Sequence, residues 1–121
     1  MTKDQIERLL AAFKDAKVPE INDDASVMEA FVNMSAFATT FAEVGLVANG
    51  TGFTQAIGQL VKEKRMPAAI AEHASEFEDL LLQGEYRFAS GDIDVEREIT
   101  EAYETLIDAL RSWANTLEAT A

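Results

Sequence analysis

The sequence predicts an all-α fold, a compact bundle of four to five helices, and three observations indicate it. Alanine, leucine, glutamate and glutamine are plentiful, whereas only two prolines and six glycines interrupt the 121 residues. Apolar residues recur at spacings of three and four, which is the period of an amphipathic helix. The third observation is a charge-poor middle, because residues 25–61 hold only Glu29 and Glu43 as charged side chains. Such a segment must be shielded from water by the rest of the chain or by a second copy of it.

Length and composition predict one helical domain covering residues 1–121. The absence of cysteine excludes disulfides, thiolate metal sites and a cysteine nucleophile. The first residues are charged and do not form the apolar segment of a signal peptide. The least charged stretch contains too many polar side chains for a membrane span, which needs about twenty predominantly apolar residues. We therefore expect a cytoplasmic protein that does not act at a membrane.

The first predicted helix covers residues 3–16. Thr2 and Gln5 have the spacing of a capping box, in which each side chain accepts a hydrogen bond from the other residue's backbone. Apolar residues follow on one face: Ile6, Leu9, Leu10 and Phe13. The prediction ends this helix at the segment Lys17-Val18-Pro19, because the residue before a proline disfavours helical backbone.

The second predicted helix, residues 24–47, is apolar on almost every side. The cluster Asn22-Asp23-Asp24 supplies caps for its start. One face consists of Val27, Phe31, Met34, Ala38, Phe41 and Gly45, and other apolar residues point elsewhere, namely Met28, Val32, Phe37 and Val47. A helix with so little polar surface is expected to be buried in a protein core or in an interface. We therefore expect an apolar central helix, with Ala38, Ala42 and Gly45 allowing the close approach of a neighbour.

Two further helices follow the turn Asn49-Gly50-Thr51-Gly52. The third helix covers about 53–65 and ends in a basic cluster that complements its C-terminal dipole: Lys62, Lys64 and Arg65. Pro67 suits the first turn of a fourth helix, whose inner face consists of Ile70, Ala74, Phe77 and Leu81. Gly84 is the expected stop of the fourth helix, and residues 85–91 are expected to form a linker or a short extra turn.

The fifth predicted helix begins at Asp92 or Asp94 and continues to about Leu117. Its apolar residues form a near-heptad seam, consisting of Val95, Ile99, Ala102, Leu106, Ala109, Trp113 and Leu117. Further apolar residues widen this seam to nearly half of the circumference: Tyr103, Ile107 and Leu110. The opposite face carries the acids Asp94, Glu98, Glu101, Glu104 and Asp108. This helix can contact two neighbours and still expose an acidic face.

The charge distribution narrows the class of partner. The chain has a net charge of −12, and the residues after position 66 carry most of it. Such a surface repels nucleic-acid phosphates and anionic lipid, so direct nucleic-acid binding is not expected. Acidity instead suits a basic protein partner, mimicry of nucleic acid, a salt-rich cytoplasm or solubility. The sequence alone leaves these four explanations open.

The sequence offers little for catalysis or metal binding. His73 is the only histidine, and its spacing to Glu76 reverses the Glu-x-x-His order of metal sites in helix bundles. The acidic run 92–98 resembles a calcium loop but lacks the required glycine and the bidentate glutamate. The turn 49–52 precedes a helix as an anion site does, yet it lacks the Lys-Ser/Thr ending of a phosphate loop. No cofactor and no metal are therefore expected, and an enzyme is not favoured.

We predict a non-catalytic, acidic protein–protein interaction module of the inhibitor, immunity or chaperone-like kind. Its expected partner is a basic protein, bound through charge steering and an aromatic anchor. The residues predicted to bind it are Asp94, Glu98, Glu101, Glu104, Asp108 and Trp113. Core packing is the competing interpretation of Trp113. A symmetric homodimer is also expected, formed through the second helix or the seam of the fifth.

The alternative hypothesis is a helical bundle that binds a small ligand or cofactor. Phe31, Phe41 and Phe53 are the candidate residues for an aromatic-lined pocket. Aromatic residues at helical spacing also form ordinary cores. The two interpretations predict different structures, since only one of them requires a cavity beside these rings.

Overall fold

The computed structural model describes residues 2–14, 24–89 and 94–117. Within these ranges it contains five helices and no strand, which confirms the all-α prediction. The helices are α1 (Lys3–Lys14), α2 (Asp24–Glu43), α3 (Phe53–Lys62), α4 (Ala68–Ala89) and α5 (Asp94–Thr116).

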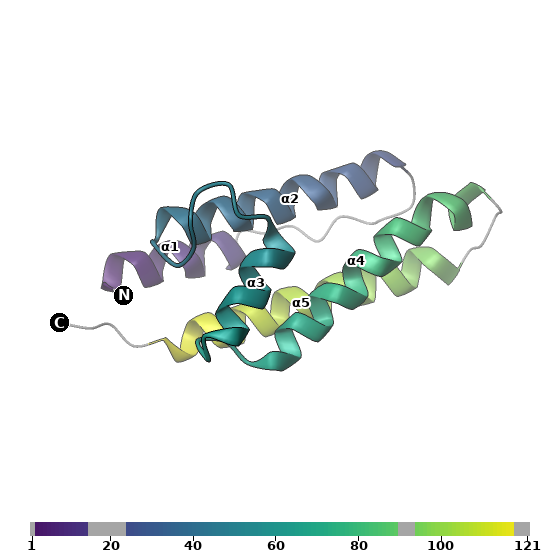
Figure 1. Cartoon of the computed structure of the whole chain (residues 1–121). Coiled ribbons are helices and arrows are strands. Elements are labelled where there is room, and N and C mark those ends of the chain that lie inside the picture. Colours follow the sequence, from purple (N-terminus) through teal and green to yellow (C-terminus); the bar gives the residue numbers. More distant parts are fainter. Residues whose placement is uncertain (1, 15–23, 90–93, 118–121) are drawn as a thin grey trace.

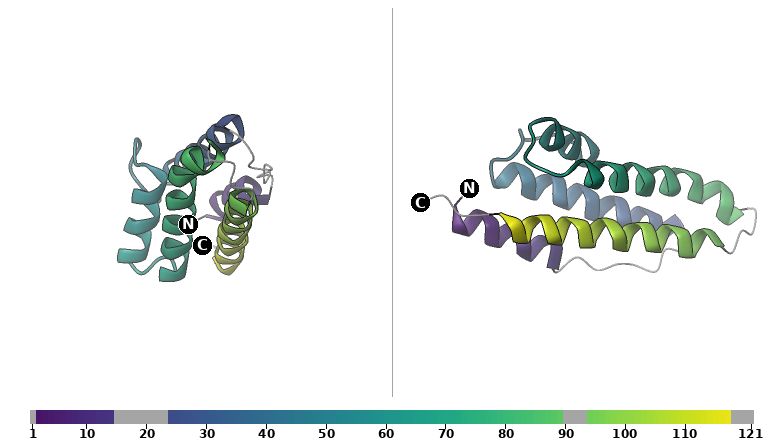
Figure 2. Two further views of the ribbon diagram at one scale, coloured as in Figure 1. Left: turned by 90° about the vertical axis from the view of Figure 1, so that its right-hand side faces the viewer. Right: turned by 90° about the horizontal axis from the view of Figure 1, so that it is seen from below.

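Four of the helices form a ring of neighbours, shown in Figure 1. α4 and α5 pack along much of their length, α1 packs against α5 and α2, and α2 completes the ring at α4. α3 contacts α2 and α4 and is inclined steeply to both in Figure 1. In the right-hand view of Figure 2, α2, α4 and α5 run in nearly the same direction. α2 therefore occupies one corner of the ring, and the expected central position is not seen.

The core is dominated by aromatic rings from all five described helices. Phe13 of α1 lies 5.4 Å from Phe37 and 6.0 Å from Phe41, both on α2, measured between ring centroids. Phe53 of α3 lies 6.1 Å from Phe37. Phe77 of α4 and Tyr103 of α5 form a separate pair at 4.9 Å. Offset and edge-on aromatic pairs at these distances stabilise a core beyond the burial of their area.

The start of α1 confirms the predicted capping box. The backbone N–H of Thr2 donates to Gln5 Oε1 at 2.7 Å, and the backbone N–H of Gln5 donates to Thr2 Oγ1 at 3.2 Å. Gln5 Nε2 also donates to the carbonyl oxygen of Val44 at 3.0 Å. One glutamine therefore caps the start of α1 and holds the chain just beyond the end of α2.

α2 ends at Glu43, four residues before the predicted boundary. Gly45 has a φ of +77°, and the backbone N–H of Leu46 donates to the carbonyl oxygen of Phe41 at 2.9 Å. A second bond joins the N–H of Gly45 to Ala42 at 3.0 Å, which completes a Schellman motif. The glycine that the sequence assigned to the helix face is the residue that terminates the helix.

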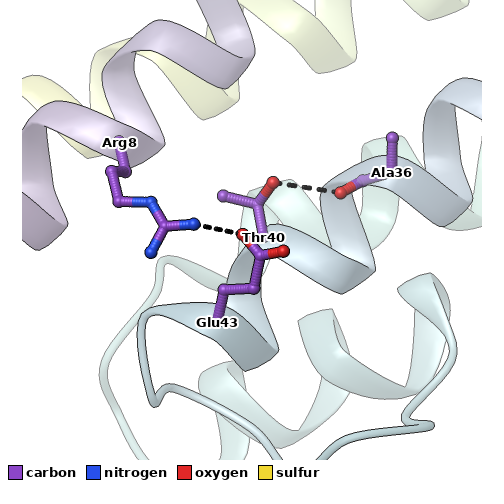
Figure 3. Close-up of polar contacts among 4 residues, drawn as sticks. All are labelled: Arg8, Ala36, Thr40 and Glu43. Atoms are coloured by element: carbon purple, nitrogen blue, oxygen red, sulfur yellow. Dashed lines mark hydrogen bonds and ion pairs between the residues drawn. The ribbon is translucent and has the colours of Figure 1, made fainter.

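Polar contacts fix this end of α2, as Figure 3 shows. Arg8 of α1 forms an ion pair with Glu43, and Thr40 Oγ1 donates to the carbonyl oxygen of Ala36 at 3.0 Å. The Arg8–Glu43 pair is solvent-exposed and therefore contributes little to stability. Its main consequence is local, since it neutralises the only acid in the last turn of α2.

α3 ends at Lys62 instead of Arg65, through the same type of motif. The backbone N–H of Arg65 donates to Leu60 at 2.8 Å, and that of Lys64 donates to Val61 at 3.0 Å. Lys64 occupies the left-handed position with a φ of 60°, where glycine is usual. A lysine gives no sequence signal for such a turn, which explains the error in the predicted boundary.

α4 shows the largest departure from prediction. It continues through Gly84 to Ala89, so the expected stop at Gly84 and the linker over 85–89 are wrong. A glycine inside a helix costs only about 1 kcal/mol relative to alanine, and helical packing can outweigh that cost. Residues 90–93, the rest of the expected linker, lie outside the described residues.

The structure of α5 agrees with its predicted seam. The helix begins at Asp94, one of the two predicted caps; the other, Asp92, lies outside the described residues. The buried residues of the predicted seam are Ile99, Tyr103, Leu106, Ile107, Leu110 and Trp113, and Ala114 is buried beside them. Ala102, Ala109 and Leu117 are partly buried and pack against the core. The side chain of Val95 lies outside the described part of the chain.

Candidate functional site

A hollow of about 490 Å³ lies between α4 and α5. Its lining consists of His73, Glu76, Leu80, Glu98, Glu101, Ala102 and Thr105. On each helix these residues recur at helical spacing, so they lie on one face. Two long helices packed side by side therefore aim polar side chains at one space.

The hollow combines an apolar floor with an acidic rim. Leu80 and Ala102 are partly buried and pack against the core. Glu76, Glu98 and Glu101 are exposed and surround this floor from both helices. Three carboxylates of one sign around a concave surface produce a negative potential that attracts cationic groups.

The acids predicted for partner binding lie on one exposed face of α5: Asp94, Glu98, Glu101, Glu104 and Asp108. Only Glu98 and Glu101 of this set line the hollow. Two of the others lie near arginines, since Asp94 is 4.0 Å from Arg97 and Asp108 is 3.6 Å from Arg111. The acidic face of α5 therefore extends beyond the hollow in both directions along the helix.

Trp113 does not lie on the acidic face. Its side chain is 5% exposed, and its ring packs edge-on against Phe41 at 6.2 Å. Its Nε1 donates a hydrogen bond of 2.9 Å to the carbonyl oxygen of Arg65. Trp113 thus belongs to the core and joins α5 to the turn before α4. It is not available as an exposed anchor, and the competing interpretation describes it correctly.

The candidate aromatic residues do not line one shared cavity among those found in the described part of the chain. Phe41 and Phe53 are buried and stack at a centroid distance of 6.5 Å. Phe31 is only partly buried and packs against the core from outside. Phe53 alone lines a hollow, of about 460 Å³, beside α2 and the turn 49–52. These contacts are those of a packed core, and no specific observation favours the small-ligand hypothesis.

The residues that α4 contributes to the hollow were not predicted as partner-binding residues. The sequence drew attention to His73 and Glu76 only as a possible metal pair. In the described residues, no group of three or more histidine, cysteine or acidic side chains is arranged to hold a metal ion. The spacing of His73, Glu76 and Leu80 in the sequence shows that they share one face of a helix. The sequence does not show how α4 aligns with α5, so the hollow could not be predicted.

Neither the helices nor known proteins add a further indication of function. No helix in the described residues has the length and apolar character needed to cross a membrane. Comparison of the chain with protein-family models, with curated proteins and with solved structures gives no match. The function must therefore be argued from the site itself.

Proposed function

We propose that this protein is a non-catalytic interaction module that binds a basic segment of a protein partner, in the manner of an inhibitor, an immunity protein or a chaperone. The observation that carries the proposal is the α4–α5 hollow, where Glu76, Glu98 and Glu101 surround an apolar floor. A cytoplasmic setting is part of the proposal, since a chain without cysteine needs no oxidising compartment.

The shape of the hollow suits a lysine or arginine side chain. Such a side chain has an apolar stem and a charged head group. It buries the stem against apolar surface while the head group remains in polar surroundings. Leu80 and Ala102 provide the apolar contact for the stem, and the carboxylates accept hydrogen bonds from the head. An arginine would gain most, because its guanidinium binds a carboxylate through two parallel hydrogen bonds.

Charge also favours the encounter with such a partner. A net charge of −12 draws a basic protein toward this chain before contact. The exposed acids of α5 that lie outside the hollow, Glu104 and Asp108, extend the attracting surface along the helix. Association is expected to be fast at low salt and to weaken as salt rises, because ions screen exposed charges.

A basic probe peptide tests this proposal. The probe is a fluorescein-labelled amphipathic helix of about twenty residues with lysine and arginine on one face. Fluorescence anisotropy is measured at about 20 mM and about 300 mM NaCl, a range over which the Debye length falls severalfold. We expect binding at low salt and a large loss at high salt.

Matched variants separate the hollow from overall charge. Glu98→Gln/Glu101→Gln should weaken binding about tenfold, as expected for the loss of two exposed ion pairs. Asp4→Asn/Glu7→Gln changes the net charge equally on α1 and should change affinity less than about twofold. Equal losses in both variants, or affinity that does not depend on salt, would contradict a binding site in the hollow.

A further inference from the structure

The exposed face of α2 is unusual in a protein this acidic. Met28 and Val32 are 61% and 63% exposed, which makes them two of the three exposed large hydrophobic residues in the described part of the chain. Three small residues lie on the same face toward the C-terminal end, namely Ser35, Ala36 and Thr39. Between Glu29 and Glu43 this face bears no charge. We refer to Met28, Val32, Ser35, Ala36 and Thr39 as the α2 stripe.

The α2 stripe continues into the neighbouring hollow of about 460 Å³. Ser35 and Thr39 line that hollow together with Ala38, Ala42 and residues 49–53. No residue of this lining is charged. The uncharged surface therefore extends from α2 across to the turn that precedes α3.

The threonine hydroxyl groups of this surface are already paired within the chain. Thr39 Oγ1 donates to the carbonyl oxygen of Ser35 at 3.0 Å. Thr51 Oγ1 donates to Ala48 at 2.7 Å, and Thr40, beside the stripe, donates to Ala36 (Figure 3). A hydroxyl donor that keeps its hydrogen bond can be removed from water at low cost. The α2 stripe is thus suited to burial against another surface.

We propose that the α2 stripe binds the α2 stripe of a second copy of this chain. A second copy is also strongly acidic, so contact across the charged faces of α4 and α5 brings like charges together. The α2 stripe is a surface where two copies can meet without this repulsion. Most of the described seam of α5, the other dimer surface that the sequence suggested, is buried within the chain.

The positions of the acids on α2 favour antiparallel pairing. In a parallel pair, each acid of α2 would oppose its own copy, namely Asp24, Glu29 and Glu43. In an antiparallel pair centred between Val32 and Ser35, each Glu29 opposes the uncharged region around Ala38, and each Asp24 lies at the level of Glu43, which already forms an ion pair with Arg8. α2 is 20 residues and thus about 30 Å long, so the interface is small and the expected affinity is micromolar.

Sedimentation velocity on the full chain tests the dimer between about 1 and about 500 µM. We expect the wild type to change from monomer to dimer across this range. Val32→Glu should weaken the dimer at least about tenfold, because it places two charges in an apolar interface. Leu82→Glu is the matched control, since Leu82 is 60% exposed on α4, and it should change the affinity less than about twofold.

A cysteine cross-link tests the orientation, and the chain has no cysteine of its own to interfere. Under mild oxidation Ser35→Cys, near the middle of the stripe, should form a disulfide-linked dimer. Ala25→Cys, near the start of α2, should remain monomeric, because antiparallel pairing places the two copies of that residue about 25 Å apart. Efficient cross-linking of Ala25→Cys would overturn the antiparallel arrangement.

The two proposals fail independently, because they use different faces. Val32→Glu should still bind the basic probe peptide, and its circular dichroism should match that of the wild type. A wild type that stays monomeric at about 500 µM overturns the dimer, even if another protein is found to bind the α2 stripe. Equal weakening by Val32→Glu and Leu82→Glu would overturn it as well. Loss of peptide binding with an intact dimer would count only against the hollow.

Discussion

α2 and α5 are similar in length and differ in almost every surface property. Both are corner helices of the ring, with 20 and 23 residues. α5 buries most of its described apolar seam and turns a row of carboxylates to solvent. α2 leaves Met28 and Val32 in solvent and has acids only near the ends of the stripe. Packing within the chain therefore does not explain the exposed apolar residues of α2, whereas it explains most of those of α5.

In the described part of the chain, the two helices meet at a polar contact and at the edge-on ring pair of Phe41 and Trp113. Asn33 Nδ2 of α2 donates to Tyr103 Oη of α5 at 3.2 Å, and Tyr103 is fully buried beside Phe77. Elsewhere their side chains converge on the aromatic core from opposite corners. The proposed site for a basic partner therefore lies on α5 and α4, and the proposed contact with a second copy lies on α2.

The strongest test of this comparison is to truncate an apolar residue on each helix. Leu106 of α5 is fully buried, so Leu106→Ala should lower the free energy of unfolding by about 2–5 kcal/mol through lost burial and a cavity. Val32→Ala on α2 should change it by less than about 0.5 kcal/mol in dilute protein. Urea unfolding followed by circular dichroism measures both. A large loss in the dilute Val32 variant would mean that the chain itself needs this side chain.

A second test concerns the contact between α5 and the end of α1. Arg111 of α5 donates to the carbonyl oxygen of Phe13 at 2.9 Å and to that of Lys14 at 3.3 Å, which caps the end of α1. Because both hydrogen bonds are lost, Arg111→Ala should lower the free energy of unfolding by about 1–2 kcal/mol.

Arg111→Lys provides the control for charge, since lysine keeps the positive charge but not the forked geometry. It should recover less than half of the loss in urea unfolding. Full recovery by lysine would show that charge near the C-terminus of α1 matters more than the two hydrogen bonds.

The contact between α2 and α5 predicts a dependence on alkaline pH. Burial raises the pKa of Tyr103 above its ordinary value of 10.0, and the nearby charge of Glu29 adds to this, while the hydrogen bond from Asn33 lowers it. The unfolded chain therefore releases this proton more readily than the folded one. The stability that depends on the neutral phenol is complete below about pH 10 and is lost as the pH rises toward the folded pKa.

Tyr103→Phe separates the two effects. At pH 7 it should cost about 1 kcal/mol, because the bond to Asn33 is lost. Above pH 10 the variant should lose less stability with rising pH than the wild type, since phenylalanine does not ionise. Urea unfolding at pH 7 and at about pH 10.5 gives both values. Parallel loss in the two proteins would assign the alkaline effect to other groups.

The smallest expected effect lies on the acidic face. Glu101 has a like charge three positions away on either side, at Glu98 and Glu104, so Glu101→Gln should raise the free energy of unfolding by about 0.2–0.5 kcal/mol at low salt. The same substitution should weaken binding of the basic probe. A gain in stability together with a loss in binding would show that the carboxylates serve recognition. Unchanged binding would favour solubility as their role.

The sequence predicted the helices well wherever apolar residues recur at helical spacing. The number of helices, the capping box of Thr2 and Gln5 and the seam of α5 all followed from local patterns. The predicted helix boundaries were wrong where a single residue has an unusual conformation or role. Gly45 ends α2 although it fits the helix face, Lys64 takes a left-handed conformation, and Gly84 continues a helix that it was expected to stop.

The site could be predicted only in part, because it depends on how two helices align. The five acids predicted for partner binding follow from the periodicity of α5, and all five are exposed as expected. Their meeting with His73 and Glu76 depends on the register of α4 against α5, which no local pattern specifies. Trp113 was ambiguous for the same reason, since its partners, Phe41 and the carbonyl of Arg65, are distant in sequence.

The bond between Trp113 and Arg65 gives the protein an internal optical reporter. Trp113 is the only tryptophan, and from α5 it contacts both α2 and the turn before α4. Its fluorescence should therefore follow the integrity of the aromatic core, and it belongs to neither proposed binding face. A partner that docks without deforming the bundle leaves the emission unchanged, and one that opens this corner shifts it to longer wavelength.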